Sequence, residues 1–281
     1  MERRICLNLF SVFFLLSTFA GAQRYCWQSS PGDSANALCN RIAVPEGYAR
    51  LVSPEGSFAR WLQHLPLKPG RGTVYFYNGV EKPNQRVHHA VIDIDTGKRN
   101  LQQCADAVMR LRAEYLFAGK QYEDIHFNFT NGERVNYSDW ARGLRPIVKE
   151  NRVVWMTSGQ QDTSYTQFRK YLTQIFIYAG TASLSGEMQA VADISEMQIC
   201  DVFIQGGFPG HAVMVVDMAR HPVSGKRVFL LAQSYMPAQS MHVLINPGDP
   251  QHSPWYPLDF PGELVTPEWT FQKSDLKRFP K

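Results

Sequence analysis

The spacing of apolar and polar positions divides the chain into strands and helices. Runs 73–77 and 87–94 are rich in β-branched and aromatic residues, as strands are, and Asn78-Gly79 after the first of them is a turn signal. Two more strands are predicted on either side of the glycine-rich turn 206–210, and a third over 228–232. The Pro- and Trp-rich C-terminal part is expected to form loops packed on the body of the fold.

Residues 100–115 are almost all good helix formers and predict a helix. Asn100 is the expected N-cap, with Gln103 at the third helical position, and Gly119 is the expected stop. Cys104 then lies in the first turn. It shares one helix face with three larger residues at spacings of four, seven and eleven: Val108, Leu111 and Tyr115.

Two other helices have clear boundaries. Ser57 is placed to cap a short helix that Pro66 stops, and 165–176 carries one apolar face that ends before Gly180. No internal repeat or low-complexity linker separates these elements. We therefore expect a single α+β domain over residues 43–281, preceded by an irregular N-terminal arm over residues 23–42.

The first 22 residues have the three-part layout of a secretory signal peptide. Charged residues 2–4 precede the apolar stretch 5–19, and the small residues 20–22 follow it. We expect the mature chain to begin at Gln23 and to be secreted or periplasmic. No other stretch has the apolar length needed to span a bilayer, so no membrane span is expected.

Composition excludes two further classes. Hydrophobic residues make up 44% and charged residues 19% of the chain, which is ordinary for a globular protein and argues against disorder. The formal net charge is only +4 and the basic residues are scattered. We therefore expect no nucleic-acid partner.

The mature chain has four cysteines in a compartment that permits disulfides: Cys26, Cys39, Cys104 and Cys200. Cys26 and Cys39 lie close together in a Ser-, Gly- and Asn-rich segment, and a bridge that closes this loop is the simplest pairing. Cys104 and Cys200 are then either bridged or free, and the number of cysteines does not choose between these states.

Cys104 and His211 are the two parts of a possible cysteine nucleophile site. Unpaired N–H groups and the dipole at a helix N-terminus favour a thiolate, so the position of Cys104 predicts a lowered thiol pKa. His211 opens an apolar strand after a glycine-rich turn, and Gln233 at the end of the next strand is the expected partner of its ring. Three neighbours are alternatives to Gln233: Ser234, Gln239 and His242.

Segment 201–216, with its glycine-rich turn before His211, resembles the histidine-bearing hairpin of NlpC-type cysteine peptidases, whose catalytic cysteine also opens a helix. The resemblance implies a papain-like core in which a helix with Cys104 packs on an antiparallel sheet with His211, with additional helices and loops around it. Residues 45–275 also resemble a family of secreted bacterial proteins classed only as a domain of unknown function.

The chain departs from the NlpC-type pattern at two positions, and its segment between Cys104 and His211 is longer than in compact members of that family. Gln103-Cys104-Ala105 stands where Asp-Cys-Ser or Asp-Cys-Gly is usual, and Cys200 precedes Asp201 where the hairpin usually opens with Gly-Asp. The remaining histidines are dispersed and lack tight ligand spacing, so we expect no metal site. No cofactor is required either.

These observations support a secreted cysteine hydrolase, a peptidase or amidase, with Cys104 as nucleophile, His211 as base and acid, and Gln233 as the residue that orients His211. The family resemblance implies a cell-envelope amide such as a peptidoglycan peptide as substrate. The alternative is a non-catalytic envelope protein that binds a glycan or peptide on the same fold, or that uses Cys104 and Cys200 as a structural disulfide. The sequence does not indicate an oligomeric state.

Overall fold

The computed structural model of the chain describes residues 25–30 and 33–280, so the predicted signal peptide lies outside the described residues. The strands of the main sheet are β1 (Ala49–Arg50), β2 (His88–Val91), β7 (Gln189–Ala190), β8 (Val202–Gln205), β9 (His211–Arg220), β10 (Arg227–Gln233), β11 (His242–Leu244), β12 (Tyr256–Pro257) and β15 (Leu276–Arg278). Among the described residues, these nine strands form one antiparallel sheet in the order β2-β11-β10-β9-β8-β15-β7, with β1 paired to β9 and β12 to β10.

The α-helices are α1 (Leu38–Arg41), α2 (Phe58–Gln63), α3 (Cys104–Ala118), α4 (Tyr137–Ala141), α5 (Tyr165–Tyr178) and α6 (Thr181–Glu187). The 3-10 turns are η1 (Ser34–Asn36), η2 (Gln85–Val87), η3 (Tyr122–Asp124), η4 (Ile194–Glu196) and η5 (Lys273–Asp275). Three hairpins complete the fold: β3 (His126–Asn128) with β4 (Arg134–Asn136), β5 (Leu144–Lys149) with β6 (Arg152–Thr157), and β13 (Leu264–Val265) with β14 (Thr270–Phe271).

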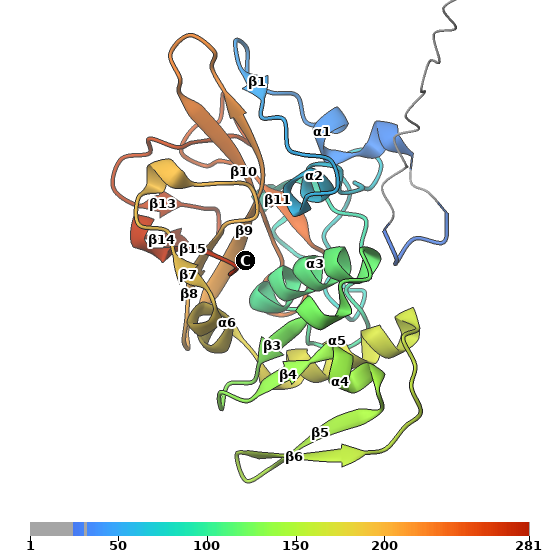
Figure 1. The fold of residues 1–281 in the computed structure, drawn as a ribbon. Helices are drawn as coiled ribbons and strands as arrows, with labels where there is room; N and C mark the ends of the chain where they lie inside the picture. Colours follow the sequence, from blue (N-terminus) through green and yellow to red (C-terminus); the bar gives the residue numbers. More distant parts are fainter. Residues whose placement is uncertain (1–24, 31–32, 281) are drawn as a thin grey trace, which may run out of the picture.

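Helices α2 and α3 pack against β9, the central strand of the sheet, and α5 packs against α3 (Figure 1). Strand β9 is buried at every position except the last, and β10 at every position except the first. Their near-continuous apolar runs follow from this burial, because a strand covered on both faces has no solvent side for polar residues. The α+β class with an antiparallel sheet is therefore confirmed.

Several predicted boundaries agree with the structure. Ser57 caps α2 by accepting a hydrogen bond from the Arg60 N–H, and α5 begins at Tyr165 and ends before Gly180. The glycine-rich turn 206–210 lies between β8 and β9, as expected. Local capping and apolar spacing determined these boundaries.

Three expectations were wrong. Residues 73–77 form only isolated bridges, through Tyr75 and Phe76, and no strand. The C-terminal part is not only loops, because β15 joins the main sheet between β8 and β7. The N-terminal arm contains η1 and α1, and Leu38 is fully buried. Elements of two to four residues carry too little periodicity to be recognised from sequence alone.

Candidate functional site

Cys104 is the first residue of α3, because Gln103 and not Asn100 is the N-cap. The Gln103 backbone N–H donates to the Asp106 carboxylate at 3.1 Å, which fixes the start of the helix. The Asn100 side chain is engaged elsewhere, since its Oδ1 accepts a hydrogen bond from the Ala238 N–H at 2.8 Å. The expected N-cap was therefore wrong, whereas the placement of Cys104 in the first turn was right.

The Cys104 side chain is buried, with 4% of the residue exposed, at a pocket of about 480 Å³. Burial raises the pKa of the Cys104 thiol to about 11, and the nearby Asp106 carboxylate adds to this. Backbone N–H groups of Ala105 and Ala212 lower the pKa but do not offset the burial. The expected lowering of the thiol pKa was wrong, because the helix N-terminus acts here on a thiol that is removed from water.

The packing of α3 on β9 brings the thiol next to the backbone at the start of β9. Ala212, whose N–H interacts with the sulfur, directly follows His211. The Tyr235 ring is 4.8 Å from the His211 ring, and burial together with the nearby Glu268 carboxylate raises the pKa of its hydroxyl. In the described part of the chain, no hydrogen bond joins the thiol to the His211 ring.

His211 and Gln233 face each other from the adjacent strands β9 and β10. The ring nitrogen Nε2 of His211 lies 2.7 Å from Oε1 of Gln233. His211 is 1% exposed, and this burial lowers the pKa of its imidazole to about 4, with the Gln233 hydrogen bond acting in the opposite direction. The imidazole is therefore neutral at pH 7.

Two charged residues behind Gln233 determine how its amide is oriented. The Gln233 Nε2 donates to Glu268 at 2.8 Å, and the other carboxylate oxygen of Glu268 lies 2.5 Å from the Lys82 ammonium. A carboxylate only accepts hydrogen bonds, so the amide nitrogen must face Glu268 and the amide oxygen must face His211. His211 then carries its proton on Nε2, and Nδ1 is left as a bare acceptor.

Glu268 and Lys82 were missed by the sequence reasoning. Glu268 lies in the C-terminal part that was expected to be loops, and Lys82 follows the turn at Asn78-Gly79. Both are largely buried, with side-chain exposures of 16% and 7%. In the sequence, each of them is only a charged residue near aromatic and apolar neighbours. That pattern does not show which distant residue the charge will pair with.

None of the three alternatives to Gln233 forms a hydrogen bond with the His211 ring in the described structure. Ser234 Oγ donates to a backbone carbonyl at 2.9 Å, and His242 Nδ1 lies 2.8 Å from the Ser240 carbonyl. Both amide atoms of the Gln239 side chain are buried without a hydrogen-bond partner. Gln233 is therefore the member of this group that contacts the His211 ring.

Cys39, Cys104 and Cys200 are free thiols in the structure, so neither the bridge expected between Cys26 and Cys39 nor one between Cys104 and Cys200 is formed. Cys200 has φ of 86°, a conformation that favours glycine. This agrees with the interpretation that Cys200 stands in a glycine position before Asp201, whose carboxylate accepts two hydrogen bonds from Arg278.

The pocket at Cys104 is bounded by the glycine-rich turn and by the start of α6. Its lining includes Thr181, Gly210 and two exposed apolar residues, Phe208 at 96% and Met236 at 42% exposure. Gly210 leaves no room for a side chain, because a Cβ there would lie 2.5 Å from both the Gly207 carbonyl oxygen and the Thr181 hydroxyl. Segment 120–195 thus forms one wall of the pocket without closing it.

Across the described ranges, residues 25–30 and 33–280, no group of three or more His, Cys, Asp or Glu side chains is arranged to hold a metal ion. Within the same residues, no helix has both the length and the apolar character needed to cross a bilayer.

Comparison with known proteins gives a family but no characterised relative. No curated protein and no solved structure is detectably similar to the chain. Residues 38–278 match a family described as "Domain of unknown function (4846)". This match covers most of the chain and includes Cys104, His211 and Gln233. The chain therefore belongs to this family of domains of unknown function.

Proposed function

We propose that the protein is a secreted cysteine hydrolase, a peptidase or amidase with a papain-like, NlpC-type arrangement. The observation that carries the proposal is the buried chain Lys82–Glu268–Gln233–His211, which holds one imidazole tautomer beside the helix start at Cys104. A core histidine needs one hydrogen-bond partner to be satisfied. It does not need a carboxylate and an ammonium that fix the orientation of that partner.

In the proposed reaction, the Cys104 thiol and the His211 imidazole are both neutral at the start. Nδ1 of His211 takes the proton from the Cys104 thiol as the sulfur attacks the carbonyl carbon. The amide C–N bond then breaks, and the same proton passes from Nδ1 to the leaving nitrogen. Water, deprotonated by His211, hydrolyses the thioester and restores the thiol.

The surroundings of the sulfur support the tetrahedral intermediate of this reaction. Backbone N–H groups of Cys104, Ala105 and Ala212 already interact with the sulfur. Donors at a helix start are suited to stabilise the negative charge that develops on the carbonyl oxygen. Because the thiol and the imidazole are not hydrogen-bonded to each other in the described structure, substrate binding has to bring them together.

The proposed substrate is a cell-envelope amide such as a peptidoglycan peptide. This assignment rests on the NlpC-type resemblance of the histidine hairpin and on the predicted signal peptide. The pocket is compatible with a peptide, because exposed apolar side chains of Phe208 and Met236 border it next to backbone groups of the glycine-rich turn.

The test is the release of fragments from purified sacculi by the wild-type protein and by Cys104→Ala. A matched control is Cys200→Gly, which removes a different free thiol and suits the φ of 86° at that position. We expect release by the wild type and by Cys200→Gly, and none by Cys104→Ala. Equal release by all three proteins would exclude Cys104 as the nucleophile.

A non-catalytic protein that binds an envelope glycan or peptide is the second candidate. The observation that favours it is the burial of both groups, which raises the pKa of Cys104 to about 11 and lowers that of His211 to about 4, so that no thiolate–imidazolium pair forms. Under this alternative, wild type and Cys104→Ala both sediment with sacculi, and neither releases fragments.

A further inference from the structure

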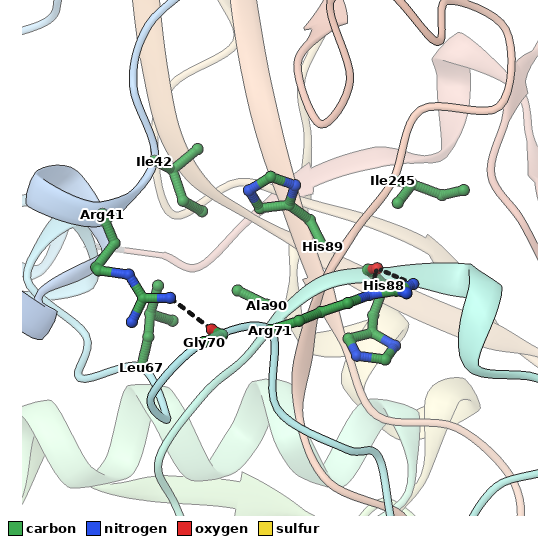
Figure 2. Close-up of a pocket in the computed structure, with 9 residues that line it drawn as sticks. All are labelled: Arg41, Ile42, Leu67, Gly70, Arg71, His88, His89, Ala90 and Ile245. Carbon is green, nitrogen blue, oxygen red and sulfur yellow. Dashed lines mark hydrogen bonds between the residues drawn. The ribbon is translucent and has the colours of Figure 1, made fainter.

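A second pocket, of about 410 Å³, lies at the edge strand β2 and shares no lining residue with the pocket at Cys104. Its polar side chains are all basic. Arg41 comes from the end of α1, Arg71 from the segment between α2 and β2, and His89 from β2 itself (Figure 2). Apolar residues complete its wall: Ile42, Leu67, Ala90 and Ile245.

The two guanidinium groups are held by backbone carbonyls and not by carboxylates. Arg41 donates to the carbonyl of Gly70 and Arg71 to that of His88 (Figure 2). Arg41 also donates to the Lys68 carbonyl and to Oδ1 of Asn36, and Arg71 to the Gln85 carbonyl. Arg41 is half-buried and Arg71 is exposed, and within the described residues neither forms a salt bridge, whereas Arg50, Arg110 and Arg278 pair with Asp217, Glu114 and Asp201. Carbonyl acceptors fix the geometry of a guanidinium but leave its charge uncompensated.

Donors remain available on both arginines. Within the described residues, the protein acceptors of Arg71 are bonded to its Nε and Nη2, which leaves the two N–H groups of Nη1 unused. The acceptors of Arg41 are bonded to Nη1 and Nη2, which leaves its Nε–H unused. Each arginine can therefore donate to a ligand without giving up its hold on the backbone.

His89 provides a third group with an ionisable proton. Figure 2 shows its ring on the opposite side of the β2 strand from the ring of His88, as alternation along a strand requires. Burial lowers the pKa of His89, and the positive charges of Arg71 and Arg41 lower it further, with no acidic group acting in the opposite direction. An anion in this pocket would reverse that effect.

From this arrangement we propose that the pocket binds a phosphate group, as the free anion or as a phosphate monoester. A phosphate dianion matches the two uncompensated guanidinium charges, whereas a monocarboxylate brings one charge and two oxygens. Arginine also suits phosphate because it donates in a fixed planar geometry. The apolar wall leaves room for an organic group attached to the phosphate. The proposal does not depend on the proposed hydrolase activity.

The first test is binding of inorganic phosphate, measured by calorimetry and by NMR titration of the His89 ring, against chloride at equal ionic strength. We expect saturable phosphate binding and a rise in the pKa of His89 when phosphate is bound. Acetate should bind much more weakly. Equal binding of acetate, or no saturable phosphate binding, would overturn the proposal.

Substitutions of pocket residues test whether phosphate binds at this pocket. Arg71→Gln should weaken phosphate binding by about tenfold or more, because it removes a charged donor. The matched control is Arg86→Gln, which removes the same charge from an exposed residue of η2 outside the pocket. Equal weakening by both variants would mean that only net charge matters, and would contradict a built site. If Arg71→Gln does not fold, His89→Gln serves as the second variant, for which several-fold weaker binding is expected.

A separate experiment distinguishes a phosphate on a lipid headgroup from a soluble phosphate. Vesicles of phosphatidylcholine with and without phosphatidic acid present the same phosphomonoester on a lipid headgroup. Binding to phosphatidic acid vesicles that is lost in Arg71→Gln indicates a lipid ligand. Phosphate binding without vesicle binding indicates a soluble one. The absence of both contradicts the proposal, and Cys104→Ala should behave as wild type in each measurement.

Discussion

At the scale of single residues, the environment of Cys104 and His211 matters more than their position on a helix and a strand. A thiol at a helix N-terminus is favoured as a thiolate only while solvent or an imidazolium can stabilise its charge. Here burial is the largest influence on the pKa of both groups, and both are neutral at pH 7. The proposed hydrolysis therefore depends on proton transfer from Cys104 to His211 during the reaction and not on a preformed thiolate.

This ionisation state predicts how Cys104 reacts with iodoacetamide. With a pKa of about 11, roughly one thiol in ten thousand is ionised at pH 7. The alkylation rate at Cys104 should therefore rise about tenfold per pH unit from pH 7 to 10 without reaching a plateau. Mass spectrometry of the Cys104 peptide measures the rate, with Cys104→Ser as the unlabelled control. A plateau near pH 7 would indicate a preformed thiolate instead.

Glu268 is a positioning residue for the proposed site, and its replacement by Gln should loosen the His211 tautomer. Glu268→Gln can donate to Gln233 as well as accept, so the Gln233 amide is no longer fixed. It also leaves the Lys82 ammonium, with only 7% of its side chain exposed, without its counter-charge.

We expect a mixture of Nδ1–H and Nε2–H forms of His211 in nitrogen-15 NMR spectra, and about tenfold lower kcat on sacculi with KM little changed. Glu263→Gln, in an exposed part of the same C-terminal segment, is the matched control. If both variants keep a single Nε2–H tautomer, Glu268 does not position the ring.

At the scale of elements, the turn between β8 and β9 sets where His211 begins its strand. Gly210 is buried between the Gly207 carbonyl and the Thr181 side chain, and this contact seats the turn on the start of α6. The same turn borders the pocket at Cys104. Gly210 is therefore explained by close packing before any role in catalysis.

Gly210→Ala should destabilise the protein by about 1–3 kcal/mol, since the new Cβ would lie 2.5 Å from two oxygen atoms. Gly186→Ala in α6 is the matched control, because nothing lies within 4 Å of a Cβ there. It should leave stability unchanged or raise it by about 0.5–1 kcal/mol. Urea denaturation of the two variants provides the comparison, and equal stabilities would contradict the packing argument.

At the scale of the whole molecule, the sheet buries ionisable groups that an exposed surface would leave in water. His211 on β9 and His242 on β11 lie on the two strands that flank β10, and burial lowers the pKa of each, to about 4 and about 3. Gln233 lies between the two rings: its Oε1 is 2.7 Å from Nε2 of His211, and its Nε2 is 3.4 Å from Nε2 of His242. The titration of both histidines therefore depends on the folded sheet.

These lowered pKa values make stability depend on pH between about 6.5 and 4. Above pH 6.5 the imidazole is neutral in both states, so it contributes no pH dependence. As the pH falls toward 4, the unfolded chain binds a proton at His211 and the folded protein does not, so the free energy of unfolding falls.

The loss attributable to His211 should be on the order of 3 kcal/mol at pH 4 relative to pH 7. The measurement is urea denaturation at a series of pH values for wild type and His211→Gln, in which this part of the slope should be missing. His252→Gln, at an exposed histidine, is the control. A slope identical in wild type and His211→Gln would mean that His211 is not buried in its neutral form.

Local sequence signals determined much of the fold and the two halves of the candidate site. Ser57 as N-cap, the apolar face of α5, the long buried runs of β9 and β10, and the place of Cys104 in a first turn all depend on neighbours along the chain. Hydrogen bonds of capping residues and the periodicity of buried positions act over a few residues, so a single sequence contains them.

Only the tertiary structure decided what surrounds these groups. The Glu268–Lys82 pair, the seat of β15 in the main sheet and the raised pKa of Cys104 each depend on segments that are distant in sequence. The same is true of the basic pocket, where Arg41, Arg71 and His89 meet from three different segments. Burial and charge pairing follow from long-range packing, and the pattern along the chain does not specify which distant residues will share one dry environment.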